Sequence, residues 1–216
     1  MIFAFDIETS KNDWAKDYFQ SSLAKPNSRL KNPLKIEEDL QKQYAKAALS
    51  WWLGKVVCIT ARSLDGNFSF IQVSTDEKKL LVDFAEFLKT ADNKYMQTIL
   101  VGKSSKEFDF PFLVGRYLAH NTGIPKVLMT KRQIVDVDEM FAQWGRNGQT
   151  TSLNNYAWGL NIVGKTDQNG AHLIDQWLDS KNYTDLTNYC DQDTKIVMEM
   201  LLRYRPYGED YAISEK

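Results

Sequence analysis

The chain has 216 residues, of which 43% are hydrophobic and 25% charged, and its formal net charge at pH 7 is −1. This is the composition of an ordinary globular protein, large enough to bury about 70% of the surface that its unfolded chain exposes, so disordered, collagen-like and coiled-coil chains are excluded. The near-zero charge excludes a protein coated with basic residues, although it leaves room for a local basic groove.

The sequence gives no sign of a membrane or export segment. No stretch approaches the roughly 20 consecutive apolar residues of a membrane span, and Asp6 interrupts the apolar start where a signal peptide needs a continuous run. We therefore expect a cytoplasmic protein without membrane contacts. Cys58 and Cys190 lie far apart in the sequence and are expected to stay reduced thiols, without a structural zinc site.

The first quarter of the chain predicts a strand followed by an unusual segment. Residues 2–8 are short and mostly apolar, which is typical of a buried strand. Residues 11–34 predict a long loop with one short helix, and residues 35–49 a helix rich in Lys, Glu, Gln and Ala. Segment 11–50 has a net charge of +3 and is interpreted as a loop and helix insertion.

The remaining elements predict a mixed α/β architecture. Strands are expected at 54–61, 68–73, 97–102 and around Val135, a turn at 167–170, and helices over 76–90, 109–121, 137–144, 152–158 and 182–203. Two consecutive early hairpins, followed by strands that alternate with helices, favour a central mixed five-stranded sheet flanked by helices.

Two carboxylates stand at the end of the first strand. Asp6 and Glu8 are two residues apart, so their side chains point to the same face of a strand. They repel each other unless a cation lies between them, and an oxygen-rich site without Cys or His suits magnesium or manganese. The alternative is a solvated strand end without a metal.

A third acid, Asp109, lies within the apolar run 108–113. A charge in such surroundings is costly unless it is paired. Asp109 could instead be the N-cap of the following helix, with Pro111 in its first turn. The two interpretations are compatible.

The last helix carries Tyr189 and Asp193, which are four residues apart and therefore share a face. Asp191 lies on another side of the helix and is expected to meet solvent. The alternative is an ordinary amphipathic helix, with Tyr189 in the core and Asp193 on the surface.

Taken together and in this order, the three segments resemble the motifs of the DEDD superfamily of 3′→5′ exonucleases, which have a ribonuclease-H-like fold. The resembling segments are Phe5-Asp6-Ile7-Glu8-Thr9, Phe108-Asp109-Phe110-Pro111-Phe112-Leu113 and Tyr189-Cys190-Asp191-Gln192-Asp193. A Tyr four residues before the last Asp, with Asn188 at the position of the alternative His, marks the Tyr type. The chain is most similar to stand-alone phage relatives of the proofreading domain of family-B DNA polymerases, which implies one exonuclease domain over residues 1–216.

The resemblance implies hydrolysis of the last phosphodiester at the 3′ end of single-stranded DNA, with release of nucleoside monophosphates. Two divalent ions, Mg²⁺ or Mn²⁺, are implied. Asp6, Glu8 and Asp193 would hold the ion that activates water, and Asp6 would bridge to a second ion that Asp109 reaches directly or through water. Tyr189 would orient the attacking water.

Three further residues are implied to contact substrate. Thr9 is positioned to touch the terminal sugar, and Phe108 to pack beside the last base, although a core role also suits Phe108. Gly102-Lys103-Ser104 stands where the second motif often carries Gly-His-Asn, and Ser104 is expected to bond a sugar or a water. Six cations are candidates for phosphate contacts, although ordinary surface charge explains any one of them: Lys103, Lys106, Arg116, Lys131, Arg132 and Arg146.

Several functions remain open on the sequence alone. The expected partner is a single-stranded DNA 3′ end, with a separate DNA polymerase or other replication proteins, in phage DNA replication or proofreading in the host cytoplasm. An RNA exonuclease of ribonuclease D type would carry the same acids and Tyr. A catalytically inactive nucleic-acid-binding module also fits these residues, as does a structural protein whose acids are caps and surface charges.

Overall fold

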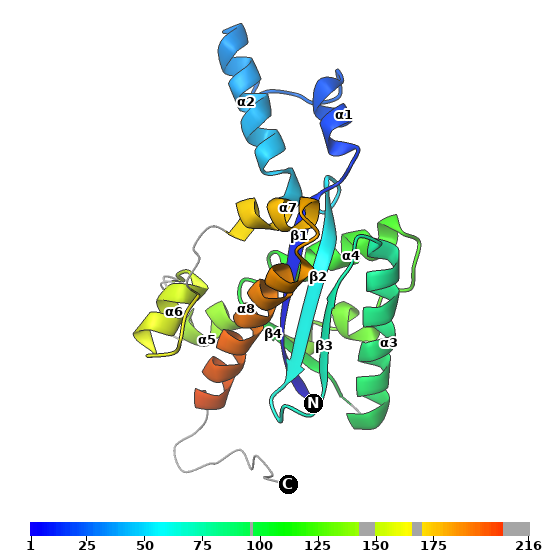
Figure 1. The fold of residues 1–216 in the computed structure, drawn as a ribbon, viewed down its shortest axis with the longest axis vertical. Coiled ribbons are helices and arrows are strands. Elements are labelled where there is room, and N and C mark those ends of the chain that lie inside the picture. The colour runs from blue at the N-terminus through cyan, green and yellow to red at the C-terminus, as the bar shows by residue number, and fades with distance from the viewer. Residues whose placement is uncertain (96, 143–149, 166–169, 205–216) are drawn as a thin grey trace.

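The computed structural model describes residues 1–95, 97–142, 150–165 and 170–204, and they surround a mixed five-stranded sheet (Figure 1). The strands are β1 (Ile2–Lys11), β2 (Gly54–Ser63), β3 (Ser69–Val73), β4 (Ile99–Gly102) and β5 (Ile134–Asp136), in the order β3-β2-β1-β4-β5. β1 and β2, like β2 and β3, are antiparallel, whereas β1-β4 and β4-β5 are parallel. The prediction of a mixed five-stranded sheet flanked by helices is confirmed.

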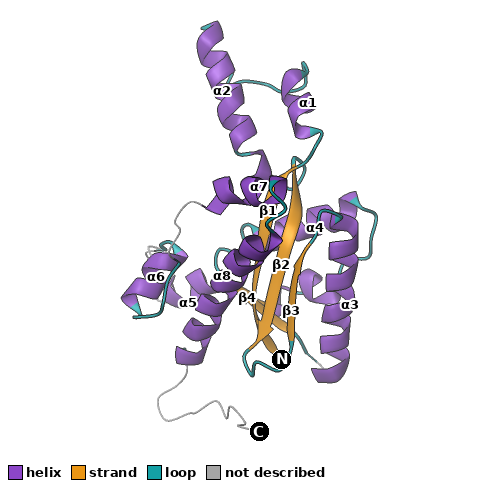
Figure 2. Ribbon diagram, in the orientation of Figure 1, coloured by secondary structure: helices purple, strands orange, loops and turns teal. Residues whose placement is uncertain are grey.

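The central strand β1 separates two layers of helices by the alternation of its side chains (Figure 2). Phe3, Phe5 and Ile7 pack with α3 (Glu77–Tyr95) and α4 (Asp109–Ala119) in the larger hydrophobic core. Ala4 points to the other face, where it packs with α8 (Tyr183–Arg203). Asp6 and Glu8 follow Ala4 at the period of two, so they lie on the face covered by α8.

The second helical layer is completed by three shorter helices. They are α5 (Val137–Ala142), α6 (Leu153–Gly159) and α7 (Gly170–Asp179). Tyr156 of α6 and Val137 of α5 pack with Ile196 and Met200 of α8, and Ile174 of α7 packs at the other end of α8. Among the described helices, none is both long and apolar enough to cross a membrane.

Residues 12–53 between β1 and β2 form a projection that we call the arm. It consists of α1 (Ala15–Gln20), α2 (Pro33–Ala45) and the short 3₁₀ helix η1 (Ala47–Leu49), and it extends beyond one end of the sheet (Figure 1). The arm has a core of three small or medium buried residues, Ala15, Ala47 and Leu53. α2 buries no residue at all, so the arm is mostly surface.

The predicted elements match the structure except for α7 and two short 3₁₀ helices, η2 (Lys126–Met129) and η3 (Lys131–Gln133). Each expected strand and helix is present, and β1 and α3 run a few residues further than predicted. α7 was not predicted, and most of the turn expected at 167–170 lies outside the described residues. Cys58 and Cys190 are free buried thiols, as expected. That residues 1–216 form a single exonuclease domain stays a prediction.

Candidate active site

β1 and α8 bring four chemically relevant side chains together. Asp6, Glu8 and Cys190 offer ligand atoms that lie within 4.8 Å of one another, and the Cys190 Sγ is 3.6 Å from Asp6 Oδ2. Asp193 lies one helical turn beyond Cys190 and is close enough to Asp6 and Glu8 to alter their ionisation. The register of β1 with β2 shifts between Glu8 and Thr9, as in a β-bulge, and the pairing continues from Thr9 to Lys11.

Asp109 joins this group from the start of α4. Its side chain is 4% exposed, and hydrogen bonds from its own backbone and from that of Ile7 bind the carboxylate to β1 between the two strand acids. Phe108, not Asp109, holds the N-cap position of α4 and makes no side-chain cap bond. The N-cap interpretation of Asp109 is therefore wrong, because the residue lies within the first turn and is directed at β1.

Crowding of these acids raises their pKa values. Burial is the largest cause for Asp6, and the negative charges of Asp193, Glu8 and Asp109 raise the pKa of Asp6 further. Burial raises the pKa of Glu8 to about 8, and burial together with the charge of Asp136 raises the pKa of Asp109 to about 7. The pKa of Asp193 is raised by burial as well. Such a group binds a cation favourably, since a positive charge relieves the repulsion among its members.

Lys165 supplies a positive charge within this group, and sequence reasoning missed it. Its ammonium forms an ion pair with Asp193 and lies 3.2 Å from the centre of the Tyr189 ring, with only 7% of the side chain exposed. Burial opposes the charge of Lys165, but the attraction of Asp193 and Glu8 outweighs it and raises the pKa of the lysine. No spacing in the sequence links this loop residue to Asp193.

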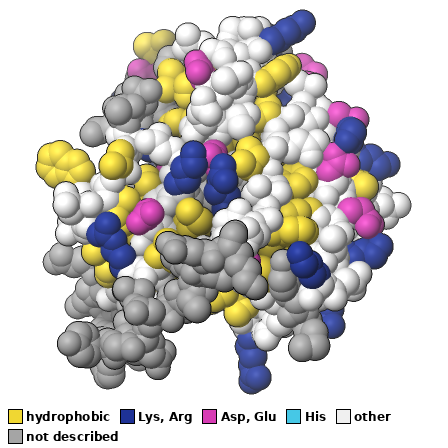
Figure 3. Space-filling view, turned by 60° about the horizontal axis from the view of Figure 1, so that its bottom comes forward, with side chains coloured by type: hydrophobic (Ala, Val, Ile, Leu, Met, Phe, Trp, Pro, Cys, Tyr) yellow, Lys and Arg dark blue, Asp and Glu magenta, His cyan; other side chains and the backbone are white. Residues whose placement is uncertain are grey.

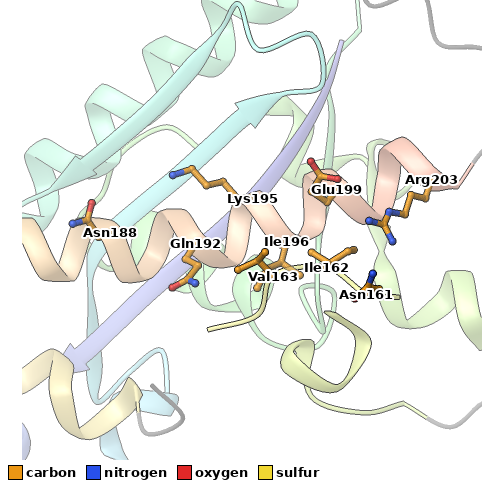
Figure 4. A pocket seen from close by; sticks show the side chains of 9 residues that line it. All are labelled: Asn161, Ile162, Val163, Asn188, Gln192, Lys195, Ile196, Glu199 and Arg203. Carbon is orange, nitrogen blue, oxygen red and sulfur yellow. The ribbon is translucent and has the colours of Figure 1, made fainter. Parts of the chain in front are cut away.

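The loop that carries Lys165 is anchored to two helices. Asn154 of α6 accepts a hydrogen bond of 2.8 Å from the Lys165 N–H, and Gln192 of α8 donates one of 3.1 Å to the Gly164 carbonyl. A groove of about 560 Å³ lies between the loop and the outer side of α8 (Figure 4). None of the predicted site carboxylates lines this groove, so it is separate from the carboxylate group.

The three predicted substrate contacts have partners within the protein. Thr9 donates a hydrogen bond of 2.8 Å to the Ala48 carbonyl, and the Ser104 hydroxyl donates one of 2.7 Å to Asp138. Ser104 has a φ of 55°, in the left-handed region, and its carbonyl accepts the N–H of Phe108 at 3.0 Å. Phe108 is half-buried beside the larger core. Their contacts with substrate stay predictions.

Asp191 is buried, although it was expected to meet solvent. It is 5% exposed and is bound by Arg62 of β2 and by Lys195, whose ammonium lies 2.7 Å from a carboxylate oxygen. Burial opposes ionisation of Asp191, but hydrogen bonds from Arg62 and Lys195 outweigh it and lower the pKa. The expectation of a solvent-facing Asp191 is wrong because α8 lies over β2 as well as β1, so a second side of the helix is covered.

Three of the six candidate phosphate contacts are engaged in ion pairs within the protein. The pairs are Lys103 with Asp138, Lys106 with Glu139 and Arg116 with Glu77. Lys131 and Arg132 are exposed, and Arg146 lies outside the described residues.

The donor set fits a hard divalent cation. Four carboxylates converge, and His is not among the described neighbours that shift their pKa values. Burial, and then the neighbouring Cys58 and Asp6, raise the pKa of the Cys190 thiol, and its sulfur is a softer ligand atom than a carboxylate oxygen. Magnesium and manganese prefer such oxygen-only sites.

Comparisons with known proteins identify the family and the fold of the chain. The sequence pattern of a family described as "Predicted 3'-5' exonuclease related to the exonuclease domain of PolB" matches residues 48–209. The fold is similar to a family B DNA polymerase from the hyperthermophilic archaeon Pyrobaculum calidifontis, with a TM-score of 0.59 and 16% identity, over 94% of this chain and 24% of that one. The comparison with curated proteins found no match. The chain belongs to the family of predicted 3′→5′ exonucleases related to the exonuclease domain of PolB.

Proposed function

We propose that the protein is a metal-dependent 3′→5′ exonuclease that releases nucleoside monophosphates from the 3′ end of single-stranded DNA. The observation that carries the proposal is the convergence of Asp6, Glu8, Asp109 and Asp193 from β1, α4 and α8, with pKa values raised by burial and mutual repulsion. A purely structural cluster of surface acids would show neither the burial nor the shared repulsion.

We propose the following ligand set. Asp6, Glu8 and Asp193 would hold one divalent ion, and Asp6 and Asp109 would hold a second. Asp6 is assigned to both ions because the negative charge of each of the other three acids raises its pKa. Two ions of Mg²⁺ or Mn²⁺, when bound, lower the pKa of a water molecule and neutralise charge on the phosphate.

Tyr189 is proposed to orient the attacking water. Burial, followed by the charges of Glu8 and Asp193, raises the pKa of the phenol, so it stays protonated at neutral pH and acts as a hydrogen-bond donor or acceptor instead of a base. Water attacks the terminal phosphorus, the bond from that phosphorus to the 3′ oxygen of the preceding nucleotide breaks, and a 5′-monophosphate leaves. The shortened strand retains a 3′ hydroxyl and can be cut again.

The biological setting follows from the resemblance. The polymerase that this chain is similar to is a much longer protein, since the chain covers 24% of it. On its resemblance to stand-alone phage relatives, we propose that this exonuclease works with a DNA polymerase or other replication proteins in replication or proofreading in the cytoplasm. An RNA 3′ end is the second candidate substrate, because tolerance of a terminal 2′ hydroxyl is not fixed by the four acids.

The test is a time course on matched single-stranded DNA and RNA oligonucleotides labelled at the 5′ end, with magnesium, manganese or a chelator. A ladder that shortens by one nucleotide at a time from the 3′ end, requires metal and disappears with Asp6→Ala supports the proposal and identifies the substrate. Binding of both strands without cleavage under either metal would contradict it and favour an inactive nucleic-acid-binding module.

A further inference from the structure

The arm begins and ends beside the carboxylate group. Thr9, the residue after Glu8, donates its hydroxyl hydrogen bond to Ala48 of the arm, and the Asn12 N–H donates one of 2.8 Å to the Leu53 carbonyl. These bonds fix the base of the arm to the end of β1 that carries the site acids. A strand that leaves the site in this direction would therefore pass along the arm.

Segment 18–36 of the arm carries four cations that form no ion pair with the described residues, and the acids Glu37, Glu38 and Asp39 follow directly within α2. The charged residues of segment 18–36 are all cations, and all are exposed: Lys25, Arg29, Lys31 and Lys35. We call this group the basic tip.

Several cations elsewhere form ion pairs with acids. Lys11 and Lys55, at the base of the arm, form ion pairs with Asp175 at 2.8 Å and with Asp13 at 2.9 Å. On the face turned forward in Figure 3, Lys and Arg side chains lie among Asp and Glu side chains. The basic tip is therefore a local positive surface on a protein whose net charge is −1.

Aromatic rings occupy the base of the arm, between the site acids and the basic tip. Trp14 and Trp52 are 44% and 40% exposed, and their ring centres are 6.3 Å apart. Tyr18 packs edge-on against Trp52 at 5.1 Å, which holds that ring in place. Half-exposed, fixed rings are surfaces on which nucleic-acid bases stack.

These features favour a nucleic-acid strand as the occupant. A positive surface combined with exposed aromatic rings is the usual arrangement for binding single strands without sequence preference. An acidic protein partner would account for the cations but would leave the tryptophans without a role. α2 alone spans about 20 Å, so the basic tip is reached only by a strand several nucleotides long.

We propose that the basic tip of the arm is a second binding site, for backbone phosphates of the single strand whose 3′ end lies at the carboxylate group. The proposal rests on the proposed exonuclease function and extends it to the part of the substrate that is not cut. The arm then increases the affinity for long strands and leaves that for the shortest ones unchanged.

The test measures binding of labelled single-stranded DNA of three and of about twenty nucleotides in chelator, which prevents metal-dependent cleavage, over a range of salt concentrations. The variant Arg29→Gln/Lys31→Gln removes two cations of the basic tip, and Lys78→Gln/Lys126→Gln removes two exposed ones away from the arm. For the long strand we expect the tip variant to bind more weakly than the wild type. The plot of log affinity against log salt concentration should be less steep for the variant by about 1.4, because each of two lost phosphate contacts contributes about 0.7 to the slope. The control variant should match the wild type.

Two outcomes would overturn the inference: an unchanged affinity and salt slope in the tip variant, or an equal decrease in the control variant. Cleavage by the wild-type protein in magnesium, run in parallel, separates this failure from failure of the proposed function. If the wild-type protein cuts and the tip variant binds and cuts long strands normally, the arm inference alone is wrong. If the wild-type protein cuts neither DNA nor RNA, the proposed function is wrong.

Discussion

At the scale of single residues, Lys165 links the site acids in the absence of metal. Its ammonium pairs with Asp193, and the side chain is almost fully buried. We expect Lys165→Met to lower the free energy of unfolding of the metal-free protein by about 3 kcal/mol, the typical cost of removing one partner of a buried ion pair. Because a bound cation would replace the missing charge, magnesium should raise the melting temperature of this variant more than that of the wild type.

Lys195→Met is the matched control for this prediction. Lys195 also pairs with an aspartate of α8, Asp191, but it is 57% exposed and the aspartate keeps Arg62 as a partner. Its removal should change stability by less than about 1 kcal/mol and leave the response to magnesium as in the wild type. An equal response of both variants would show that Lys165 does not substitute for a metal ion.

Tyr189 should contribute less to the rate of cleavage than the acids do, because its proposed role is only to orient the attacking water. Tyr189→Phe removes the hydroxyl and keeps the ring that packs under Lys165 and against Trp177. We expect kcat to decrease by about 10- to 100-fold and the melting temperature to stay near that of the wild type. A loss as large as that caused by Asp6→Ala would mean that Tyr189 does more than orient water.

At the scale of elements, α8 carries two acids with different roles, Asp191 and Asp193, which are only two residues apart. Asp191 pairs with Arg62 and thereby ties the helix to β2, whereas Asp193 faces the other acids. We expect Asp191→Asn to lower the free energy of unfolding by about 2 kcal/mol, because hydrogen bonds to charged groups are lost. Urea unfolding measures this, and an unchanged midpoint would contradict the structural role.

Elements with a strong periodic pattern were predictable from the sequence, and the four acids that the resemblance singled out lie together in the structure. The period of two in β1 put Asp6 and Glu8 on one face, and the spacing of four in α8 put Tyr189 and Asp193 on another. α7 was missed although Ile174 and Leu178 stand four residues apart, since its start follows directly on the turn residues 167–170.

Features that depend on packing between distant segments were not predictable. Lys165 reaches Asp193 only because Asn154 and Gln192 hold its loop against α8, and neither contact leaves a pattern in the sequence. Asp191 was expected to meet solvent because a single helix was considered without the strand beneath it. Arg62, its partner, is 129 residues away.

At the scale of the whole molecule, the crowded acids make stability depend on pH. The pKa of Glu8 is raised from 4.5 to about 8 and that of Asp109 from 3.8 to about 7, so the folded protein binds these protons more tightly than the unfolded chain does. Their contribution to stability is therefore present at low pH and is lost as the pH rises to about 8. We expect the melting temperature of the metal-free protein to fall between pH 5 and pH 8.

The variant Glu8→Gln/Asp109→Asn isolates this effect from the rest of the molecule. It removes two of the four acids whose pKa values are raised, so its melting temperature should depend less on pH and should exceed that of the wild type at pH 8 without metal. Magnesium should stabilise the wild type at pH 8 but not the variant. Identical pH profiles of the two metal-free proteins would contradict the assignment of raised pKa values to these acids.

The central claim is that Asp193, and not its neighbour Asp191, belongs to a metal-dependent nuclease site. The most direct test is a time course on single-stranded DNA labelled at the 5′ end, in magnesium, with the wild type, Asp193→Asn and Asp191→Asn. We predict a ladder from the 3′ end for the wild type and for Asp191→Asn, and a rate lower by about 1,000-fold or more for Asp193→Asn, equivalent to a loss of at least about 4 kcal/mol. Cleavage by Asp193→Asn within about tenfold of the wild type, a change of about 1.4 kcal/mol, would contradict the account.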